Sequence, residues 1–167
     1  MIIVQCKHKV KGGNKMNAIY KKGQVRKTDK QFKKHFTQFS EKEVQYLKSK
    51  VKKLKNNVYF SKHELNNGND TTLQQIKNNI NNDMNIIEYN VTYYDEDKVD
   101  IRVVVRGNEI YSVNFKKSNG HIINKEANLC FVISIISGKI ITTYYNEVKD
   151  NHETIDLRRY CEFLKII

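Results

Sequence analysis

The chain has 167 residues, 39% of them hydrophobic, which is enough for one domain with a real core and excludes a wholly disordered protein. There is no proline or tryptophan, and the formal net charge is +12, which points to an acidic partner such as nucleic acid. No apolar run approaches the roughly 18 residues of a membrane span, the N-terminus does not read as a signal peptide, and three cysteines lack metal-like spacing. A membrane protein, a secreted disulfide mini-protein and a zinc finger are therefore excluded, and we expect a cytoplasmic protein of a bacterial host cell.

The positive charge is concentrated at the N-terminal end. Residues 1–62 contain 18 Lys/Arg and 3 acidic residues, whereas residues 63–167 contain 12 Lys/Arg and 15 acidic residues. If lysine were only the default surface residue of an AT-rich genome, the excess would extend over the whole chain. A one-sided block of this kind is instead typical of a surface that binds an anionic partner.

The first fifteen residues differ from the rest. The pentapeptide KGGNK precedes Met16, and codons for this stretch can contain a purine-rich ribosome-binding sequence. We therefore expect residues 1–15 to be a translated leader or a disordered segment; the alternative is a flexible Gly-Gly loop. The expected division continues with a basic helical arm over 16–57 and an α+β domain with an antiparallel meander over 58–167.

The first predicted helix spans residues 29–38. Thr28 and Gln31 have the spacing of a capping box, in which side chains and backbone exchange hydrogen bonds at a helix start. Three phenylalanines would then share one face, with two lysines beside them that are expected to bind the partner: Phe32, Phe36, Phe39, Lys33 and Lys34.

A second capping box, Ser40 and Glu43, predicts a helix that runs to about residue 55. Its apolar stripe has the spacing of an amphipathic helix and consists of Val44, Leu47, Val51 and Leu54. Lysines opposite this stripe or on its flank are the other expected contacts to an anionic partner: Lys42, Lys48, Lys52 and Lys53.

Two shorter helices follow. Ser61 and Glu64 form the third capping box, with His63 in the first turn of the helix that they begin. After the helix-breaking sequence NNGND, either Thr71 or Thr72 begins another helix. Its inward residues are Leu73, Ile76 and Ile80.

From residue 86 the hydrophobic period changes to two, which predicts strands. The first three strands have their apolar residues at 87–93, 99–105 and 111–115, and Arg102 and Arg106 leave the same face of the second. Ser137-Gly138 predicts a two-residue hairpin turn between the fourth and fifth strands, pairing Ile135 with Ile140. One face would hold Leu129, Phe131, Ile133, Ile135, Ile140, Thr142 and Tyr144, and the other Cys130, Val132, Ser134, Ile141, Thr143 and Tyr145. The predicted fold class is α+β, with N-terminal helices packed on a five-stranded, mostly antiparallel sheet.

The sequence YFSKHE resembles the F-S-x-H-A opening of toxin-locus and phage proteins of the barnase/colicin/RelE-like ribonuclease-toxin fold. The segment NEVKDNHETIDLRRY resembles the end of small phage proteins from low-GC Gram-positive bacteria. These resemblances imply a helix-then-meander fold over about residues 58–160. Glu64 stands where that family has alanine, and NNGND replaces the arginines that usually follow.

Metal-independent RNA cleavage needs a base, an acid and cations for the phosphate. If the chain were a ribonuclease, the residues to consider would be His63, Arg102, Arg106, Thr143 and Tyr145. All but Thr143 also have a structural interpretation: His63 as a surface residue, the arginines in cross-strand pairs with Asp95, Asp97 or Asp100, and Tyr145, like Tyr144, as a packing residue. His121 and His152 have no partner at metal spacing, so we expect neither a metal nor another cofactor.

Three function classes remain open. The first is a phage or mobile-element inhibitor, similar to an anti-CRISPR protein, whose basic helices bind a host RNA-guided nuclease or its guide or target nucleic acid. The second is a metal-independent ribonuclease toxin, and the third is a non-catalytic nucleic-acid-binding accessory protein. The charged N-terminal block and the departures from the ribonuclease motif favour the first class, in which no residue is catalytic.

Overall fold

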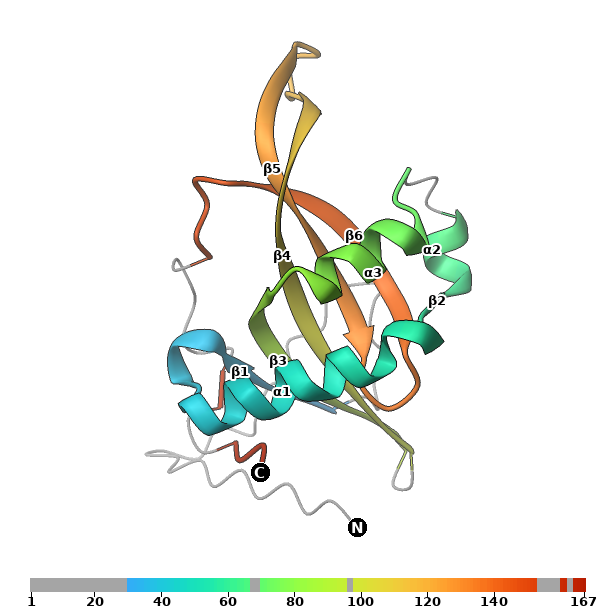
Figure 1. Cartoon of the computed structure of the whole chain (residues 1–167), viewed down its shortest axis with the longest axis vertical. Helices are drawn as coiled ribbons and strands as arrows, with labels where there is room; N and C mark the ends of the chain where they lie inside the picture. Colours follow the sequence, from blue (N-terminus) through green and yellow to red (C-terminus); the bar gives the residue numbers. More distant parts are fainter. Residues whose placement is uncertain (1–29, 67–69, 96–97, 153–159, 162–163) are drawn as a thin grey trace.

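A mixed sheet forms the centre of the molecule. The computed structural model describes residues 30–66, 70–95, 98–152, 160–161 and 164–167 (Figure 1). Within these ranges six strands are ordered β1-β3-β4-β5-β6-β2, and all neighbours are antiparallel except β2 and β6, which are parallel. The strands are β1 (Lys30–His35), β2 (Tyr59–Phe60), β3 (Met84–Asp95), β4 (Lys98–Lys116), β5 (Ile122–Ser134) and β6 (Lys139–Glu147).

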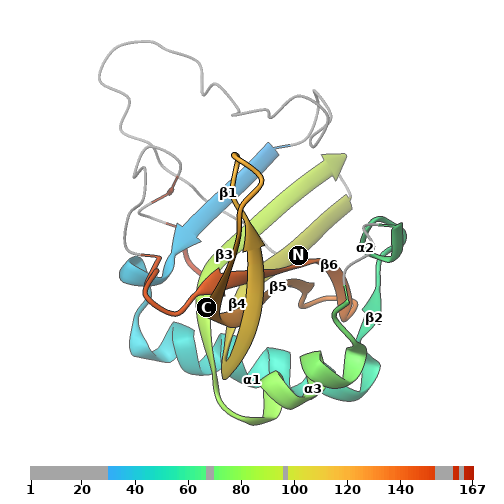
Figure 2. The same ribbon diagram turned by 90° about the horizontal axis from the view of Figure 1, so that it is seen from above.

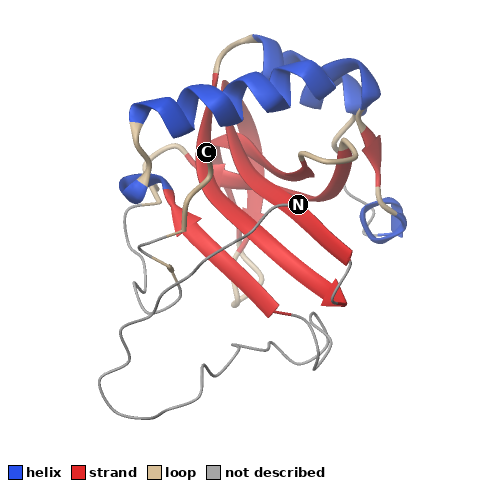
Figure 3. Cartoon of the chain, turned by 90° about the horizontal axis from the view of Figure 1, so that it is seen from below, coloured by secondary structure: helices blue, strands red, loops and turns tan. Residues whose placement is uncertain are grey.

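Two helices cover one face of this sheet. They are α1 (Glu41–Leu54) and α3 (Leu73–Asn81), which lie next to each other in Figures 2 and 3. The short α2 (Lys62–Asn66) packs against β2 and β6, and single 3-10 turns, η1 (Phe36–Gln38) and η2 (Lys55–Asn57), flank α1. All helices that the structure describes are too short or too polar to cross a bilayer.

The predicted starts of α1 and α3 are confirmed. Ser40 and Glu43 form a reciprocal capping box at the start of α1, and Thr72, rather than Thr71, forms one with Gln75 at the start of α3. Each box satisfies backbone N–H groups that have no partner inside the helix.

The hydrophobic core lies between these two helices and the sheet. The residues that are fully buried in it include Leu47 and Val51 from α1, Ile76 and Ile80 from α3, and Met84, Val91, Val103, Val105, Leu129, Phe131, Ile133 and Ile140 from the strands. The predicted apolar stripes of both helices therefore face the sheet. Residues 30–57 contribute to the same core as the rest of the chain. The predicted leader, residues 1–15, lies outside the described residues.

The predicted fold class is wrong, first because residues 30–35 form a strand and not part of a helix. β1 pairs antiparallel with β3, and the side chains of Phe32 and Lys34 point to the α1 side while Lys33 points to the other. The alternation was hidden because a lysine occupies an inward position. Lys34 is buried there and its Nζ donates to the Glu43 carboxylate at 2.7 Å, a partner that sequence periodicity does not reveal.

The number of strands also differs from the predicted five. The apolar segments 99–105 and 111–115 belong to a single long strand, β4, because the chain continues through Gly107 without a turn. The added strands are β1 at one edge and the two-residue β2 at the other.

Two irregularities change which residues face the core. A register shift between Ile86 and Glu88 places Ile86, not Ile87, in the core cluster together with Tyr89. In β6, the shift between Ile140 and Thr142 places Thr143 and Tyr145 on the core side, and Thr142 and Tyr144 on the other side. The predicted faces of β6 are therefore wrong beyond Ile140.

The predicted register of the β5–β6 hairpin is also wrong. Ile133, rather than Ile135, pairs with Ile140, because the turn takes the four residues from 135 to 138. Gly138 closes it at φ +79°, a conformation that side chains disfavour, and a Cβ at this position would lie 2.7 Å from the carbonyl oxygen of Asn57.

Candidate anion-binding surface

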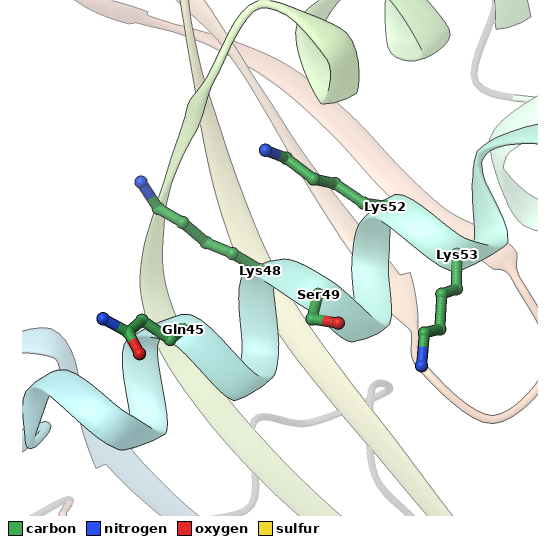
Figure 4. Close-up of a pocket in the computed structure, with 5 residues that line it drawn as sticks. All are labelled: Gln45, Lys48, Ser49, Lys52 and Lys53. Carbon is green, nitrogen blue, oxygen red and sulfur yellow. The ribbon is translucent and has the colours of Figure 1, made fainter.

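The outer side of α1 presents the lysines that the sequence identifies. Leu47 and Val51 are fully buried on the inner side, which fixes the rotation of the helix. The side chains of Lys42, Lys52 and Lys53 are consequently exposed. In Figure 4, Lys52 leaves the helix toward one side and Lys53 toward the other. Within the described part of the chain, none of these three ammonium groups forms an ion pair.

The fourth predicted lysine is partly neutralised. Lys48 Nζ donates to Asp83 Oδ1 at 2.8 Å, at the junction between α3 and β3. The hydrogen bond from Lys48 holds the pKa of Asp83 below its ordinary value, with smaller contributions from the Met84 backbone N–H and the charge of Lys52. Asp83 therefore stays ionised and draws Lys48 toward α3, as the direction of Lys48 in Figure 4 also shows.

An open hollow lies along this side of α1. Its lining consists of Gln45, Lys48, Ser49, Lys52 and Lys53 (Figure 4). Ammonium, hydroxyl and amide groups all donate hydrogen bonds, so the lining suits phosphate or carboxylate oxygens. Lys52 and Lys53 are also in the last turn of α1, where positive charge stabilises the helix dipole, so part of their role is structural.

The remaining two predicted contact residues do not extend this surface. Lys34 is buried in its ion pair with Glu43, and Lys33 lies on the opposite side of the sheet with its Nζ 3.0 Å from Glu88. Their expected place beside the phenylalanines of an exposed helix is wrong because β1 is a strand. The candidate anion-binding surface is therefore α1 alone, with Lys42, Lys48, Lys52 and Lys53.

The candidate ribonuclease residues lie on different sides of the sheet. Thr143 and Tyr145 face the core, where Thr143 is buried and donates to Glu64, and the Tyr145 ring packs on Tyr111 with centroids 5.5 Å apart. Arg102 and Arg106 point to the side away from α1 and α3. His63 is exposed on α2. The five residues thus do not form one cluster.

Glu64 explains the departure from the resembled motif in structural terms. Ser61 Oγ accepts from the Glu64 backbone N–H at 3.1 Å, which is one half of the predicted capping box, but the Ser61 backbone N–H donates to the Ile140 carbonyl and not to Glu64. The Glu64 side chain is buried and accepts the hydroxyl of Thr143 in β6. This contact attaches α2 to the sheet.

Both arginines have protein acceptors. Arg102 Nε donates to Asp100 Oδ2 at 2.6 Å, so its partner is one of the expected carboxylates but lies two positions earlier in the same strand and not across the sheet. Arg106 is 8% exposed and donates to Asn128 and to three backbone carbonyls, that of Glu147 at the end of β6 and those of Val148 and Asp150 after it. The guanidinium thereby anchors the segment after β6. Asn128 was not singled out in the sequence because nothing marks an asparagine as a partner of a distant arginine.

Two further polar residues missed by the sequence analysis lie on this same side of the sheet. His35 is 1% exposed, and its Nε2 donates to the His152 carbonyl oxygen at 3.0 Å. Glu88 accepts from Lys33 and, at 2.9 Å, from the hydroxyl of Tyr160. Burial lowers the pKa of His35, despite opposing effects of the bond to His152 and the charge of Glu88. These groups connect β1 and β3 to the C-terminal part of the chain.

Comparison with known proteins finds no matching family model, curated protein or solved structure. Nor do the described residues place three or more His, Cys, Asp or Glu side chains where they could hold a metal ion together.

Proposed function

We propose that this chain is an inhibitor protein of a phage or mobile element, similar to an anti-CRISPR protein, that binds a host RNA-guided nuclease or its nucleic acid through α1. The observation that carries the proposal is the exposure of Lys42, Lys52 and Lys53 on a helix whose other side is packed in the core. Because the helix is packed on the core, its backbone is already ordered before binding, which reduces the entropy lost on binding.

Electrostatics supports a large anionic partner. The chain has a net charge of +12, and within α1 the two acidic residues, Glu41 and Glu43, both lie in the first turn. The remaining length of the helix therefore presents only positive charge. Such a surface accelerates association with nucleic acid or an acidic protein surface and makes binding strongly dependent on salt.

The geometry favours the inhibitor over the ribonuclease toxin. The groups considered for catalysis are separated by the sheet, and Arg106 is saturated by protein acceptors. The third class, an accessory nucleic-acid-binding protein, uses the same surface of α1. It differs from an inhibitor in leaving nuclease activity unchanged.

The first test is a double charge reversal, Lys52→Glu with Lys53→Glu. Wild-type protein is expected to block target cleavage by a purified RNA-guided nuclease from the host, and the variant is expected to lose at least about tenfold in inhibitory potency. Because the reversal also opposes the dipole of α1, by about 0.3–1 kcal/mol for each charge, Lys52→Gln with Lys53→Gln gives an intermediate control. Full inhibition by both variants would exclude α1 as the interface.

The second test distinguishes the function classes in cells. Expression of the wild-type chain alone is expected to leave bacterial growth unaffected and to restore infection by a phage that the host nuclease otherwise restricts. Growth arrest that His63→Ala abolishes would instead support a ribonuclease toxin. Binding to nucleic acid with no effect on the nuclease would support an accessory protein.

A further inference from the structure

The outer part of the β4–β5 hairpin extends beyond the sheet. β3 pairs with β4 only as far as Gly107, and β6 pairs with β5 only from Ala127. The pairs from Ser112 with Glu126 outward therefore form a two-stranded ribbon that projects from the domain, as Figure 1 shows, and residues 112–126 are here called the β arm. An isolated two-stranded ribbon is only marginally stable in water, so a partner bound along the arm would stabilise it.

The charge on the arm is positive throughout its outer part. From Ile110 to Lys125 there are three lysines and no acidic residue. Lys116 and Lys117 are exposed at the tip and, within the described residues, form no ion pair, whereas Lys125 pairs with Glu147. The tip is held by a tight turn in which the Lys117 backbone N–H donates to the His121 carbonyl at 2.8 Å. The ammonium groups of Lys116 and Lys117 thus lie at the tip of the arm, on a turn with a defined backbone conformation.

One face of the arm carries three uncharged hydrogen-bonding side chains, between the exposed Glu126 at its base and the exposed Ile122 near its tip. Ser112, Asn114 and Asn124 alternate along it and are all exposed. Ser112 Oγ donates to Asn124 Oδ1 at 2.8 Å, and Asn124 Nδ2 donates to Asn114 Oδ1 at 2.9 Å. This ladder aligns the amides in a row, and asparagine amides are the side chains that pair with adenine edges in DNA.

The dimensions suit a nucleic-acid groove. Two β strands lie about 5 Å apart, and the major groove of B-form DNA, about 12 Å wide, accepts a two-stranded ribbon. The A-form RNA duplex has a major groove that side chains cannot enter. We infer that the β arm is a DNA-binding element that inserts its Ser112–Asn114–Asn124 face into the groove of a duplex, with Lys116 and Lys117 on the phosphates. The inference rests on observations separate from those for α1.

The test is fluorescence anisotropy with a labelled 20-base-pair DNA duplex, a single strand of equal length and an RNA duplex. The arm variant is Lys116→Glu with Lys117→Glu. Its matched control is Lys62→Glu with Lys149→Glu, which changes the charge by the same four units at two other exposed lysines. Loss of two phosphate contacts should reduce the slope of log K against log salt by about two. The arm variant should accordingly bind the DNA duplex at least about tenfold more weakly than the control at 50 mM salt.

Asn114→Ala with Asn124→Ala keeps the charge and tests the groove face. We expect this variant to keep the salt slope and to lose discrimination between duplexes of different sequence. Equal weakening by the arm variant and the control would overturn the inference, as would equal affinity of the wild type for DNA duplex and single strand. Sedimentation as a dimer that the arm variant makes monomeric, with unchanged DNA binding, would overturn it in favour of self-association.

The result is independent of the proposed function. The Lys52→Glu, Lys53→Glu variant in the same assay reports on α1, and nuclease inhibition reports on the inhibitor role. DNA binding that needs Lys116 and Lys117 without nuclease inhibition would support the arm and contradict the inhibitor. Nuclease inhibition that survives reversal of Lys116 and Lys117, with DNA binding no weaker than in the control, would support the inhibitor and contradict the role of the arm.

Discussion

A single buried histidine connects local structure to pH. The His152 carbonyl can only accept, so His35 Nε2 must carry the proton, which leaves Nδ1 to accept from the Thr37 backbone N–H and cap η1. A second proton on the ring would turn Nδ1 into a donor and break this cap. The neutral ring is therefore the form that the fold stabilises, in agreement with the lowered pKa of His35.

The expected consequence is acid destabilisation. The unfolded chain takes up a proton with a histidine pKa of about 6.5, whereas the folded chain takes it up at lower pH. The stabilising contribution of His35 is thus complete above about pH 6.5 and is lost as the pH falls toward the folded-state value. Urea unfolding between pH 7.5 and 5.5 should show this slope, and His35→Gln, which still donates an N–H but does not titrate, should reduce it. His152, whose pKa is also lowered by burial, accounts for part of the remainder.

The buried Lys34–Glu43 pair shows why some residues could not be placed from the sequence. A lysine at an inward strand position contradicts hydrophobic patterning, and only the partner on α1 makes the position acceptable. Burial raises the pKa of Glu43, but hydrogen bonds from Lys34 and Ser40 outweigh it, and the net pKa is lowered. The exposed lysines of α1, in contrast, were predictable because the apolar stripe alone determines the rotation of the helix.

At the scale of secondary-structure elements, local sequence signals predicted the beginnings of α1 and α3 but not the strand β1. The capping boxes at Ser40 and Thr72 begin helices, but the same spacing at Thr28 and Gln31 coincides with the beginning of a strand. Residues 30–35 form a strand because they pair with β3 over six residues, and β3 lies far along the chain. The bulges in β3 and β6 likewise depend on neighbouring strands. Alternation of polar and apolar residues therefore could not predict which side of the sheet the residues next to each bulge would face.

The long strand β4 depends on a glycine where α3 crosses it. A Cβ at Gly107 would lie 1.7 Å from Asn79 Oδ1 and 2.4 Å from Asn79 Cγ. Asn79 is fully buried, and its Nδ2 donates to the Gln75 carbonyl and to the Tyr111 hydroxyl, each at 2.9 Å. The side chain therefore cannot simply rotate away.

Gly107→Ala is expected to destabilise the protein by about 1–3 kcal/mol through overpacking. Asn79→Ala alone should also destabilise it, since it removes both hydrogen bonds. In the double variant the new methyl group occupies space that Asn79 vacates, so the combined loss should be smaller than the sum of the two. Thermal unfolding of the four proteins measures this coupling, and additive losses would contradict the contact.

At the scale of the whole molecule, the charge of +12 acts in two opposite ways. Positive charges on one folded chain repel one another, and added salt screens that repulsion. The same salt weakens attraction to an anionic partner.

Raising NaCl from 50 to 300 mM should therefore increase the melting temperature of the free protein while reducing its affinity for DNA or another polyanion. For a chain of this size a gain of 1 kcal/mol corresponds to about 2–4 °C. Differential scanning calorimetry and anisotropy on the same preparation make the comparison. A melting temperature that falls together with affinity would show that self-repulsion does not limit stability, contrary to this expectation.

Residues near the end of the sequence cover the outer edge of β1, the first strand that the structure describes. β1 is the last strand on its side of the sheet, and its Lys33 carbonyl accepts from the Cys161 backbone N–H at 2.8 Å, while Leu164 is buried in the core. The contacts at residues 161 and 164 come after all six strands in the sequence. A folding intermediate in which the sheet forms first would therefore present an unprotected edge, the state in which strands of neighbouring chains pair. How quickly these last contacts form after the sheet would thus influence how much of this protein folds rather than aggregates.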